Sequence, residues 1–256
     1  GKTGYPSLKN AIDGVIPGPQ VWEACLTGKY RMVGDWYSGK GSQAGEDRTC
    51  DVHCIIHDEN AYLQTGPNMK RGIEAHRKMD FVLSKAQFMT TQAMYSDIVL
   101  PVTTQWEVPG GLASSNREFL YCFSQVTEPL YEAKTDVQIN TLIMKAIGVD
   151  PTTVYPISEK QAFFNSIATA TVIKDDDSGK YEPIVTITDE DIKEWGVEGK
   201  PQTGRVSLKE FVSKGGYQVK RSAGDKYSSF IGHADFIKDP EKKPLTTKSG
   251  KFEITC

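Results

Sequence analysis

The stretch that most constrains the fold runs over residues 88–107, with the sequence FMTTQAMYSDIVLPVTTQWE. It predicts a short helix, then a strand at Asp97–Leu100, then a stop at Pro101, whose ring removes a backbone donor. The strand has three consecutive apolar residues, as expected for a parallel strand covered on both faces. Ligands of open α/β sheets bind beyond the carboxyl ends of such strands, so the polar turn at 103–107 predicts a ligand crevice. An ordinary core strand with an exposed loop is the alternative interpretation.

Strand and helix patterns alternate in the segments that precede this strand. Strands are expected at Val52–Ile56 and Phe81–Ser84, with helices at Met69–Lys78 and Thr90–Tyr95. This order predicts parallel strands that are joined by right-handed crossovers.

Outside this region the chain predicts mainly helices. They are expected at Val21–Thr27, Thr135–Ala146, Ser158–Ala168, Asp189–Trp195 and Ser207–Lys214, with a strand at Glu118–Phe123 and a hairpin around residues 177–179. Residues 109–115 contain two glycines and predict a loop.

Composition excludes some classes of partner. The net charge of −3 provides no basic field for nucleic acid. No apolar run reaches the roughly 18–20 residues that cross a bilayer, so direct membrane insertion is not expected. Five cysteines are an odd number, and a disulfide scaffold is not expected at this size. Cys25 and Cys122 lie in apolar segments and are predicted to be small core residues.

One cluster of cysteines and histidines has two interpretations. Cys50, His53, Cys54 and His57 would share one face of a helix and would suit zinc. On a strand, residues four apart lie about 13 Å from each other, too far for one metal ion. The β-branched neighbours favour the strand, so a core strand is preferred over a metal site.

The motif at residues 88–107 resembles the molybdopterin oxidoreductases of the dimethyl sulfoxide reductase family. In that family a phenylalanine and a threonine open a short helix, followed by Ala-Asp-Ile-Val-Leu-Pro, two hydroxyl residues and a glutamate. Ser96 replaces the alanine here, whereas Asp97–Pro101, the pair at 103–104 and Glu107 match.

The resemblance continues in the flanking sequence. Asn116–Arg117 and VTEPLYEAKTDVQINTLIMKAIG are similar to a return strand and the helix after it, and DPEKKPLTTKSGKFEI is similar to the passage into a last domain. The likeness is strong over residues 52–147, fair over 230–255 and weak elsewhere.

The resemblance implies an α/β fold: a Rossmann-like three-layer sandwich with a mainly parallel sheet, plus an irregular α+β C-terminal extension. It implies an irregular connector at 1–49 and a molybdopterin-guanine-dinucleotide-binding domain at 50–170. Residues 171–256 would be a peripheral α+β extension that leads to a missing C-terminal domain. Because the chain has no initiator methionine and stops in a strand-like segment, we expect an internal fragment of a longer polypeptide.

The function implied is that of a molybdenum-dependent oxidoreductase catalytic subunit, an anaerobic reductase of a small oxidised substrate. Its cofactor would be molybdopterin guanine dinucleotide with molybdenum, and the missing N-terminal part has room for an iron–sulfur cluster. Expected partners are a small-molecule substrate, an iron–sulfur electron-transfer subunit and a membrane anchor subunit. The resemblance places the intact enzyme on the periplasmic or cell-surface side. The chain offers no identifiable molybdenum ligand or catalytic residue, so the fragment alone is expected to be inactive.

The turn after the first strand supplies three candidate cofactor-binding residues. The family usually carries Gly-Gly-Asn-Pro there, and this chain lacks the paired glycines. Asn60 stands in for the family asparagine with a one-residue slip, while Gln64 and Thr65 resemble formate dehydrogenase relatives. Polar side chains and free amides beside a helix start suit a phosphate or a guanine edge, although a plain capped turn would look the same.

The end of the second strand departs from the family more clearly. Ala86 occupies the position of a family aspartate and has no hydrogen-bonding side chain. Lys85 either meets a phosphate as a point charge or is an ordinary solvated lysine.

Three further candidates flank the third strand. Thr90 is expected to cap a helix and, by resemblance, to lie near the dinucleotide. Asp97 would accept a hydrogen bond either from guanine or from a backbone amide. Glu107 would either orient the crevice loop or pair with Arg117.

Two other function classes remain open. The chain would be a non-catalytic α/β interaction module if it kept the fold and lost the cofactor, which the missing glycines and Ala86 favour. A dehydrogenase ranks last, because no Gly-x-Gly-x-x-Gly follows the first strand. No hydrolytic constellation is recognisable, since His76 is expected on a charged helix face and His233 in a late loop.

Overall fold

The computed structural model describes residues 4–8, 15–32, 45–58, 61–115, 118–176, 178–220, 231–247 and 249–253. The chain forms two compact units: the first unit comprises Asn10–Leu100 and Ala223–Cys256, and the second unit comprises Gly1–Lys9 and Pro101–Ser222. Both mix helices with short strands, so the predicted mixed α/β class is confirmed. The domain boundaries predicted at residues 49/50 and 170/171 stay predictions.

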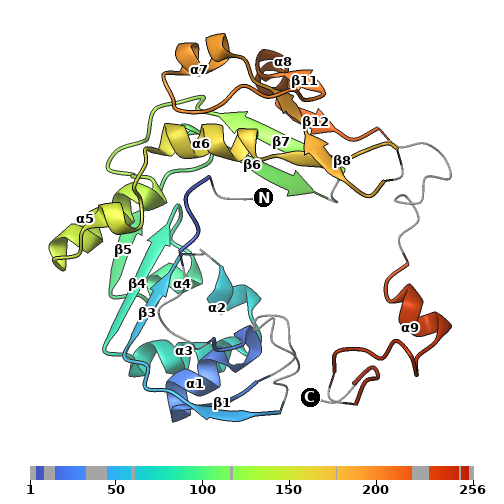
Figure 1. The fold of residues 1–256 in the computed structure, drawn as a ribbon. Coiled ribbons are helices and arrows are strands. Elements are labelled where there is room, and N and C mark those ends of the chain that lie inside the picture. Colours follow the sequence, from blue (N-terminus) through green and yellow to red (C-terminus); the bar gives the residue numbers. More distant parts are fainter. Residues whose placement is uncertain are drawn as a thin grey trace. The chain divides into compact units, whose positions relative to one another are not determined.

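A three-stranded sheet of order β3-β4-β5 forms the centre of the first unit. Strand β3 (Cys54–His57) pairs in parallel with β4 (Phe81–Ala86), and β5 (Ile98–Pro101) lies on the other side of β4 (Figure 1). The Asp97 amide donates to the Val82 carbonyl at 2.8 Å, which puts the start of β5 beside the start of β4. Strand β5 therefore runs in the same direction as β4, and the three predicted strands are found within two residues of their expected bounds.

Helices of the first unit come before, between and after these strands in the sequence. They are α1 (Val21–Thr27), α2 (Tyr62–Thr65), α3 (Met69–Lys78), α4 (Thr91–Met94) and α9 (Ala234–Lys238), with the 3₁₀ turn η1 (Gly18–Gln20) and the antiparallel pair β1 (Lys29–Arg31) and β2 (Asp47–Thr49). The bounds of α1 and α3 are those predicted, and α3 begins where the Asn68 side chain accepts a hydrogen bond from Arg71.

The core of the first unit forms where α1 packs on α3. Trp22 and Cys25 of α1 are buried with Leu63 and Ala75, so the prediction that Cys25 is a core residue is confirmed. At Gly72 a Cβ would lie 2.5 Å from a Leu63 methyl carbon, so the close packing depends on glycine at this position.

The second unit contains an antiparallel sheet of order β12-β7-β6. Its strands are β6 (Gly110–Ser115), β7 (Phe119–Ser124) and β12 (Gly216–Gln218), and helix α6 (Glu159–Ala168) lies across the sheet (Figure 1). The α6 side chains Phe163, Phe164 and Ile167 are buried in a core that includes Cys122 of β7, as predicted for this cysteine.

The remaining elements of this unit are the 11-residue helix α5 and several shorter helices and strands. They are α5 (Asp136–Ala146), η2 (Pro151–Thr153), β8 (Thr171–Ile173), β9 (Tyr181–Pro183), β10 (Val185–Thr186), α7 (Asp189–Trp195), β11 (Val206–Ser207) and α8 (Leu208–Ser213). Strands β8 and β9 pair antiparallel, which confirms the predicted hairpin. The predicted helix starts are also confirmed, because Thr135, Ser158 and Ser207 each cap a helix with their side chains.

The predicted loop at residues 109–115 is wrong, because Gly110–Ser115 is strand β6. Its glycines are explained by neighbouring rings: a Cβ at Gly110 would lie 2.3 Å from the Phe163 ring, and one at Gly111 would lie 2.5 Å from the Phe123 ring. Only three residues separate β6 from β7 in the sequence, which permits antiparallel pairing alone. Among the described strands, parallel pairing is found in the β3-β4-β5 sheet and between β10 and β11.

We expect Ile167→Ala to destabilise the second unit by about 2–5 kcal/mol, because Ile167 is fully buried and truncation leaves a cavity. Leu142→Ala on α5 is the matched control, since Leu142 is 51% exposed and should change stability by less than about 1 kcal/mol. Urea unfolding followed by circular dichroism measures both. If both substitutions shifted the urea midpoint equally, the placement of Ile167 in the core would be wrong.

Candidate functional site

The carboxyl edge of the β3-β4-β5 sheet gathers polar side chains from several segments. Asp58 directly follows β3, and Lys85 lies near the end of β4. The one-turn helices α2 and α4 follow these two strands and carry Gln64 and Gln92. This edge is where parallel sheets bind ligands.

Two glutamines hold α2 against α4. The Gln92 side-chain carbonyl accepts from the Leu63 amide at 3.1 Å, and the Gln64 side-chain carbonyl accepts from the Gln92 amide at 3.3 Å. Gln92 is buried, so the first bond is shielded from water. We call these two bonds the glutamine clasp; they fix the two turns that border the edge. Gln92 was missed from the sequence, where it looks like any polar residue of a short helix.

The two threonine candidates at this edge have local roles. The Thr90 hydroxyl accepts from the Ala93 amide at 3.3 Å and caps α4, as predicted. The Thr65 hydroxyl donates to the Ala61 carbonyl at 2.8 Å. Contact of either residue with a cofactor stays a prediction.

Lys85 is buried, so its interpretation as a solvated lysine is wrong. Residues 82–86 of β4 are all buried, because this strand is central in its sheet. The Lys85 ammonium lies 2.6 Å from the Asp58 carboxylate, and the two side chains are 1% and 71% exposed. A buried ammonium needs such a partner, because an unpaired buried charge is costly. Asp58 is a second residue that was missed from the sequence.

Asp97 lies at the opposite edge of the sheet from Lys85. Its carboxylate accepts from the Val82 amide at 2.7 Å, next to the backbone bond that starts β5. Of the two roles predicted for Asp97, the structure shows the hydrogen bond to a backbone amide.

Glu107 belongs to the second unit and orders a loop there. Its carboxylate accepts from the Thr104 amide at 2.7 Å, the Thr104 hydroxyl at 2.9 Å and the Leu130 amide at 2.8 Å. These bonds hold the pKa of Glu107 below its usual value, and the bond from the Thr104 backbone amide has the largest effect. The orienting role predicted for Glu107 agrees with this geometry. Asn60 and Arg117 lie outside the described residues.

A buried histidine pair ties the end of β3 to α3. His57 and His76 approach at 2.8 Å between their Nε2 atoms, and His76 Nδ1 lies 2.6 Å from the Gly72 carbonyl. Since the carbonyl requires a proton on His76 Nδ1, neutral His76 accepts from His57 through Nε2. Burial lowers the pKa of His57 to about 4 and also lowers the pKa of His76.

The predicted position of His76 on a charged helix face is wrong. Gly72, Ala75 and His76 share the buried face of α3, beneath Trp22 of α1. Their i, i+3, i+4 spacing is typical of one buried helix face and could have predicted this burial. The neighbouring charged residues Arg77 and Lys78 favoured an exposed face instead.

The strand interpretation of the Cys50–His57 cluster is confirmed for β3. Cys54 is exposed and His57 buried, so they lie on opposite faces of the sheet. His53 instead sits between two carboxylates, 2.7 Å from Asp80 and 3.2 Å from Asp51. Across the described ranges, no three side chains of metal-binding type are grouped to hold an ion, and no helix has the length and apolarity to span a membrane.

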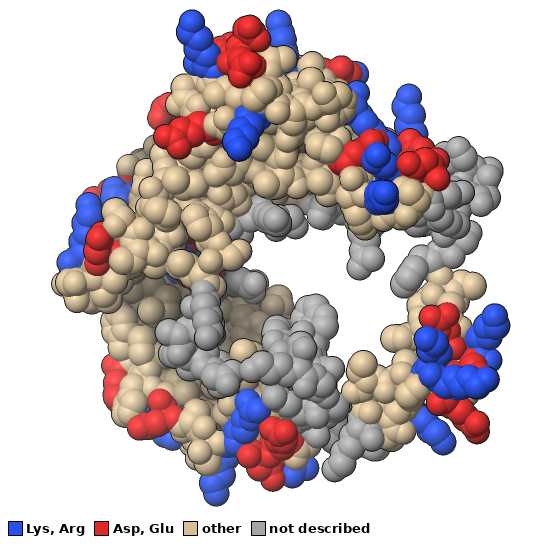
Figure 2. Space-filling model, viewed as in Figure 1, with Lys and Arg blue, Asp and Glu red and all other residues tan. Residues whose placement is uncertain are grey.

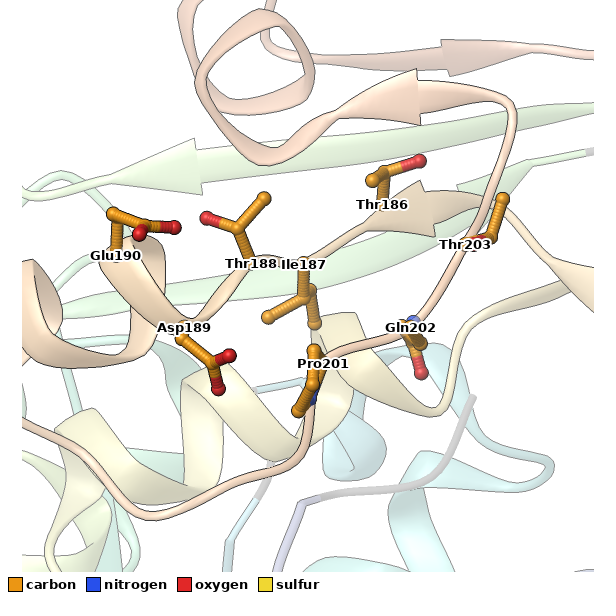
Figure 3. A pocket seen from close by; sticks show the side chains of 8 residues that line it. All are labelled: Thr186, Ile187, Thr188, Asp189, Glu190, Pro201, Gln202 and Thr203. Atoms are coloured by element: carbon orange, nitrogen blue, oxygen red, sulfur yellow. The ribbon is translucent and has the colours of Figure 1, made fainter.

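An open groove of about 380 Å³ lies in the second unit, and its lining includes none of the predicted site residues. Its walls are residues 186–190 on one side and 201–203 on the other (Figure 3). The polar groups there serve the fold: Thr188 forms a capping box with Asp191, and the Gln202 side-chain amide donates to the Val185 carbonyl. This groove therefore gives no sign of a ligand site.

Surface charge does not indicate a polyanionic partner. On the face in Figure 2, Lys and Arg side chains lie among Asp and Glu side chains. This mixture agrees with the net charge of −3.

The part of the chain that carries this edge is similar to known proteins. Residues 43–146 match the family model described as molybdopterin oxidoreductase. This segment is similar to the molybdopterin oxidoreductases. It contains the whole β3-β4-β5 sheet and the glutamine clasp.

Similar curated proteins include reductases of trimethylamine N-oxide and of dimethyl sulfoxide. The chain is 28% identical over 192 residues to trimethylamine-N-oxide reductase of Vibrio parahaemolyticus, covering 71% of this chain and 19% of that protein. It is 26% identical over 200 residues to dimethyl sulfoxide/trimethylamine N-oxide reductase of Cereibacter sphaeroides, covering 72% and 19%. The chain thus spans about a fifth of the length of these relatives. Acetylene hydratase from Pelobacter acetylenicus superposes with a TM-score of 0.47 at 18% identity, over 91% of this chain and 23% of that one.

The histidine pair predicts acid sensitivity. An unfolded histidine has a pKa of about 6.5, and His57 in the fold has a pKa of about 4. The stability that neutral, buried His57 contributes is therefore fully present above the pKa of unfolded histidine. It is lost as the pH falls towards the pKa of His57 in the folded protein. We expect the free energy of unfolding to fall by up to roughly 3 kcal/mol between these values, and His57→Gln to flatten this slope.

His53→Gln is the control, because Asp80 raises the pKa of His53. Its contribution is present below the unfolded pKa and is lost as the pH rises through the folded one. Urea titrations at several pH values separate the two histidines. A His57→Gln variant that keeps the slope of the original protein would show that the pair does not control acid stability.

Proposed function

We propose that this chain is part of the catalytic subunit of a molybdenum-dependent oxidoreductase, and that the carboxyl edge of its parallel sheet holds part of a molybdopterin guanine dinucleotide. The observation that carries the proposal is the assembled edge, where the glutamine clasp fixes two turns beside the buried Lys85 ammonium. Its support from outside the chain is the family match over the same residues.

The residues of the edge fit a phosphorylated nucleotide. Lys85 would meet a phosphate oxygen, and Gln64, Thr65 and Thr90 would border the nucleotide from α2 and α4. Asn60 completes the set by resemblance. Ala86 lacks the carboxylate that the family usually has at this position, so the end of β4 carries one negative charge fewer than in that family.

Asp97 and Glu107 act indirectly in this proposal. Asp97 would hold β5 in register with β4 from the far edge, and Glu107 would keep its loop in one conformation. When bound, the cofactor supplies two-electron chemistry at molybdenum. The role of this chain is to bind and orient it.

The whole protein would be an anaerobic reductase of a small oxidised molecule. Two relatives are named for reduction of trimethylamine N-oxide, and one of these also for dimethyl sulfoxide. We propose a substrate of this class, an iron–sulfur electron-transfer subunit and a membrane anchor subunit as partners, and a position outside the cytoplasm. An iron–sulfur cluster would belong to a part of the protein beyond this sequence.

The proposal extends to the architecture of the intact protein. The β3-β4-β5 sheet would be part of a Rossmann-like three-layer sandwich, with residues 50–170 as the dinucleotide-binding domain. Residues 171–256 would lead into a further domain.

The test is cofactor analysis of the intact protein, purified anaerobically. Molybdenum measured by mass spectrometry and guanine nucleotide released by acid should both be present in stoichiometric amounts. Protein from cells starved of molybdate is the control and should lack the metal. Absence of both from protein made with molybdate would contradict the proposal and favour the alternative, a non-catalytic α/β interaction module that has lost the cofactor.

A further inference from the structure

Two neighbouring loops of the second unit present large apolar side chains to solvent. Trp106 lies in the loop between β5 and β6, and Val126, Leu130 and Tyr131 lie in the loop between β7 and α5. These four residues, which we call the apolar patch, are between 60% and 100% exposed. Apolar side chains in water contribute little to the stability of a fold, and a group of them on a surface marks an interaction site.

Hydrogen bonds join the two loops. The Trp106 carbonyl accepts from the Val126 amide at 2.8 Å and from the Thr127 amide at 3.1 Å. The carboxylate of the buried Glu107 accepts from the Leu130 amide at 2.8 Å. The apolar patch is therefore one assembled surface and not two independent loops.

The second of these loops has a fixed backbone although residues 124–132 are all exposed. The Ala133 amide donates to the Leu130 carbonyl at 3.1 Å, and the Lys134 amide donates to the Pro101 carbonyl at 3.3 Å. Tyr131 lies inside this turn with a φ of 53°, a left-handed conformation that residues other than glycine seldom adopt. The strained turn thus holds a fully exposed aromatic side chain in place.

A fixed backbone that carries an exposed aromatic side chain suits a preformed binding surface. Backbone strain of this kind is concentrated at binding sites. Aromatic side chains supply much of the binding energy of interfaces, and a loop that is already ordered loses less entropy on binding. Glycine would adopt the backbone conformation of Tyr131 without strain, so the local fold gives no reason for a tyrosine at this position.

The charges beside the apolar patch indicate which kind of partner it fits. Glu128 and Glu132 are the charged residues of the exposed segment 124–132. Carboxylates disfavour contact with an anionic lipid surface. A protein surface with an apolar centre and basic groups at its rim complements both the apolar side chains and the two carboxylates.

The similar reductases indicate where this protein surface comes from. About four fifths of each of these proteins lies outside the part that aligns with this chain. Both loops lie within the match at residues 43–146, so they belong to the part of the chain that such longer proteins share. A surface on the same polypeptide is covalently tethered, and its high effective concentration favours it over a separate partner.

We propose that the apolar patch is a docking surface for another part of the same polypeptide, which packs an apolar surface with basic groups at its rim against Trp106 and Tyr131. This inference rests on the part of the proposed function that makes the chain a segment of a longer subunit, and it does not depend on the cofactor. Glu107 is then a positioning residue for the interface, because it fixes the loop that carries Leu130 and Tyr131.

The first test is photo-cross-linking in the intact protein. Tyr131→p-benzoylphenylalanine puts a photoreactive ketone in the apolar patch, and mass spectrometry identifies the residues that it captures. The captured residues should lie outside residues 1–256, in a cross-linked species that has the mass of one polypeptide. Tyr181→p-benzoylphenylalanine is the matched control, because Tyr181 is an exposed tyrosine of the second unit outside the patch. It should capture different residues.

Four results of this experiment would overturn the proposal. They are capture of a second copy or a separate subunit, capture of lipid, capture confined to residues 1–256, and capture of the same residues from positions 131 and 181. The first two would assign the patch to another occupant, and the last two would show that no specific surface covers it.

Hydrogen exchange of the intact protein tests the role of the Tyr131 ring. Tyr131→Gly removes the ring together with the backbone strain, so a purely local effect would leave stability unchanged or raise it. The proposal instead predicts that the segments captured from position 131 exchange their amide hydrogens about tenfold faster or more, because an aromatic anchor of the interface is lost. Tyr131→Phe keeps the ring and should stay within about twofold of the unsubstituted protein. Unchanged exchange in Tyr131→Gly would overturn the proposal.

Cofactor analysis separates this inference from the proposed function. Capture within one polypeptide by a protein that contains no molybdenum would support the docking surface and defeat the proposed function. Molybdenum and guanine in a protein whose apolar patch captures nothing outside residues 1–256 would defeat the docking surface alone.

Discussion

The parallel pairing of β3 with β4 is the constraint on which the rest of the first unit depends. Because it brings the carboxyl ends of both strands to one edge, α2 and α4 start side by side there. Only this arrangement allows Gln92 to bond to the Leu63 amide and Gln64 to bond to the Gln92 amide, and only this register puts Asp58 beside Lys85. An antiparallel arrangement of the same strands would send these residues to opposite ends of the sheet.

The ends of these strands bury polar groups where apolar side chains would serve stability better. Lys85 on β4 and the His57–His76 pair beneath β3 both lose hydration, and each needs a specific partner to offset that loss. Sequences depart from the rules of a stable core mainly at functional sites. The concentration of such groups at one edge, together with a clasp that fixes its borders, is what a site for a charged ligand would require.

Local signals were enough to predict much of this fold. The caps Asn68, Thr90 and Thr135 identified helix starts, because a capping side chain bonds to a backbone amide only two or three residues away. Strand β6 was missed, because Gly110 and Gly111 indicate a loop until the rings that pack on them are known. Similarly, the burial of His76 and Lys85 depends on Trp22 and on the central place of β4, which no local pattern reveals. The family motif predicted a site at this edge, but the polar contacts found there depend on the tertiary fold.

The most direct test of this account is an electron cryomicroscopy map of the intact protein with its cofactor. The account predicts the phosphates of a guanine dinucleotide at the carboxyl ends of β3 and β4, between α2 and α4 and within hydrogen-bonding distance of Lys85. A dinucleotide at the amino ends of these strands, next to Asp97 and Asp80, would contradict it.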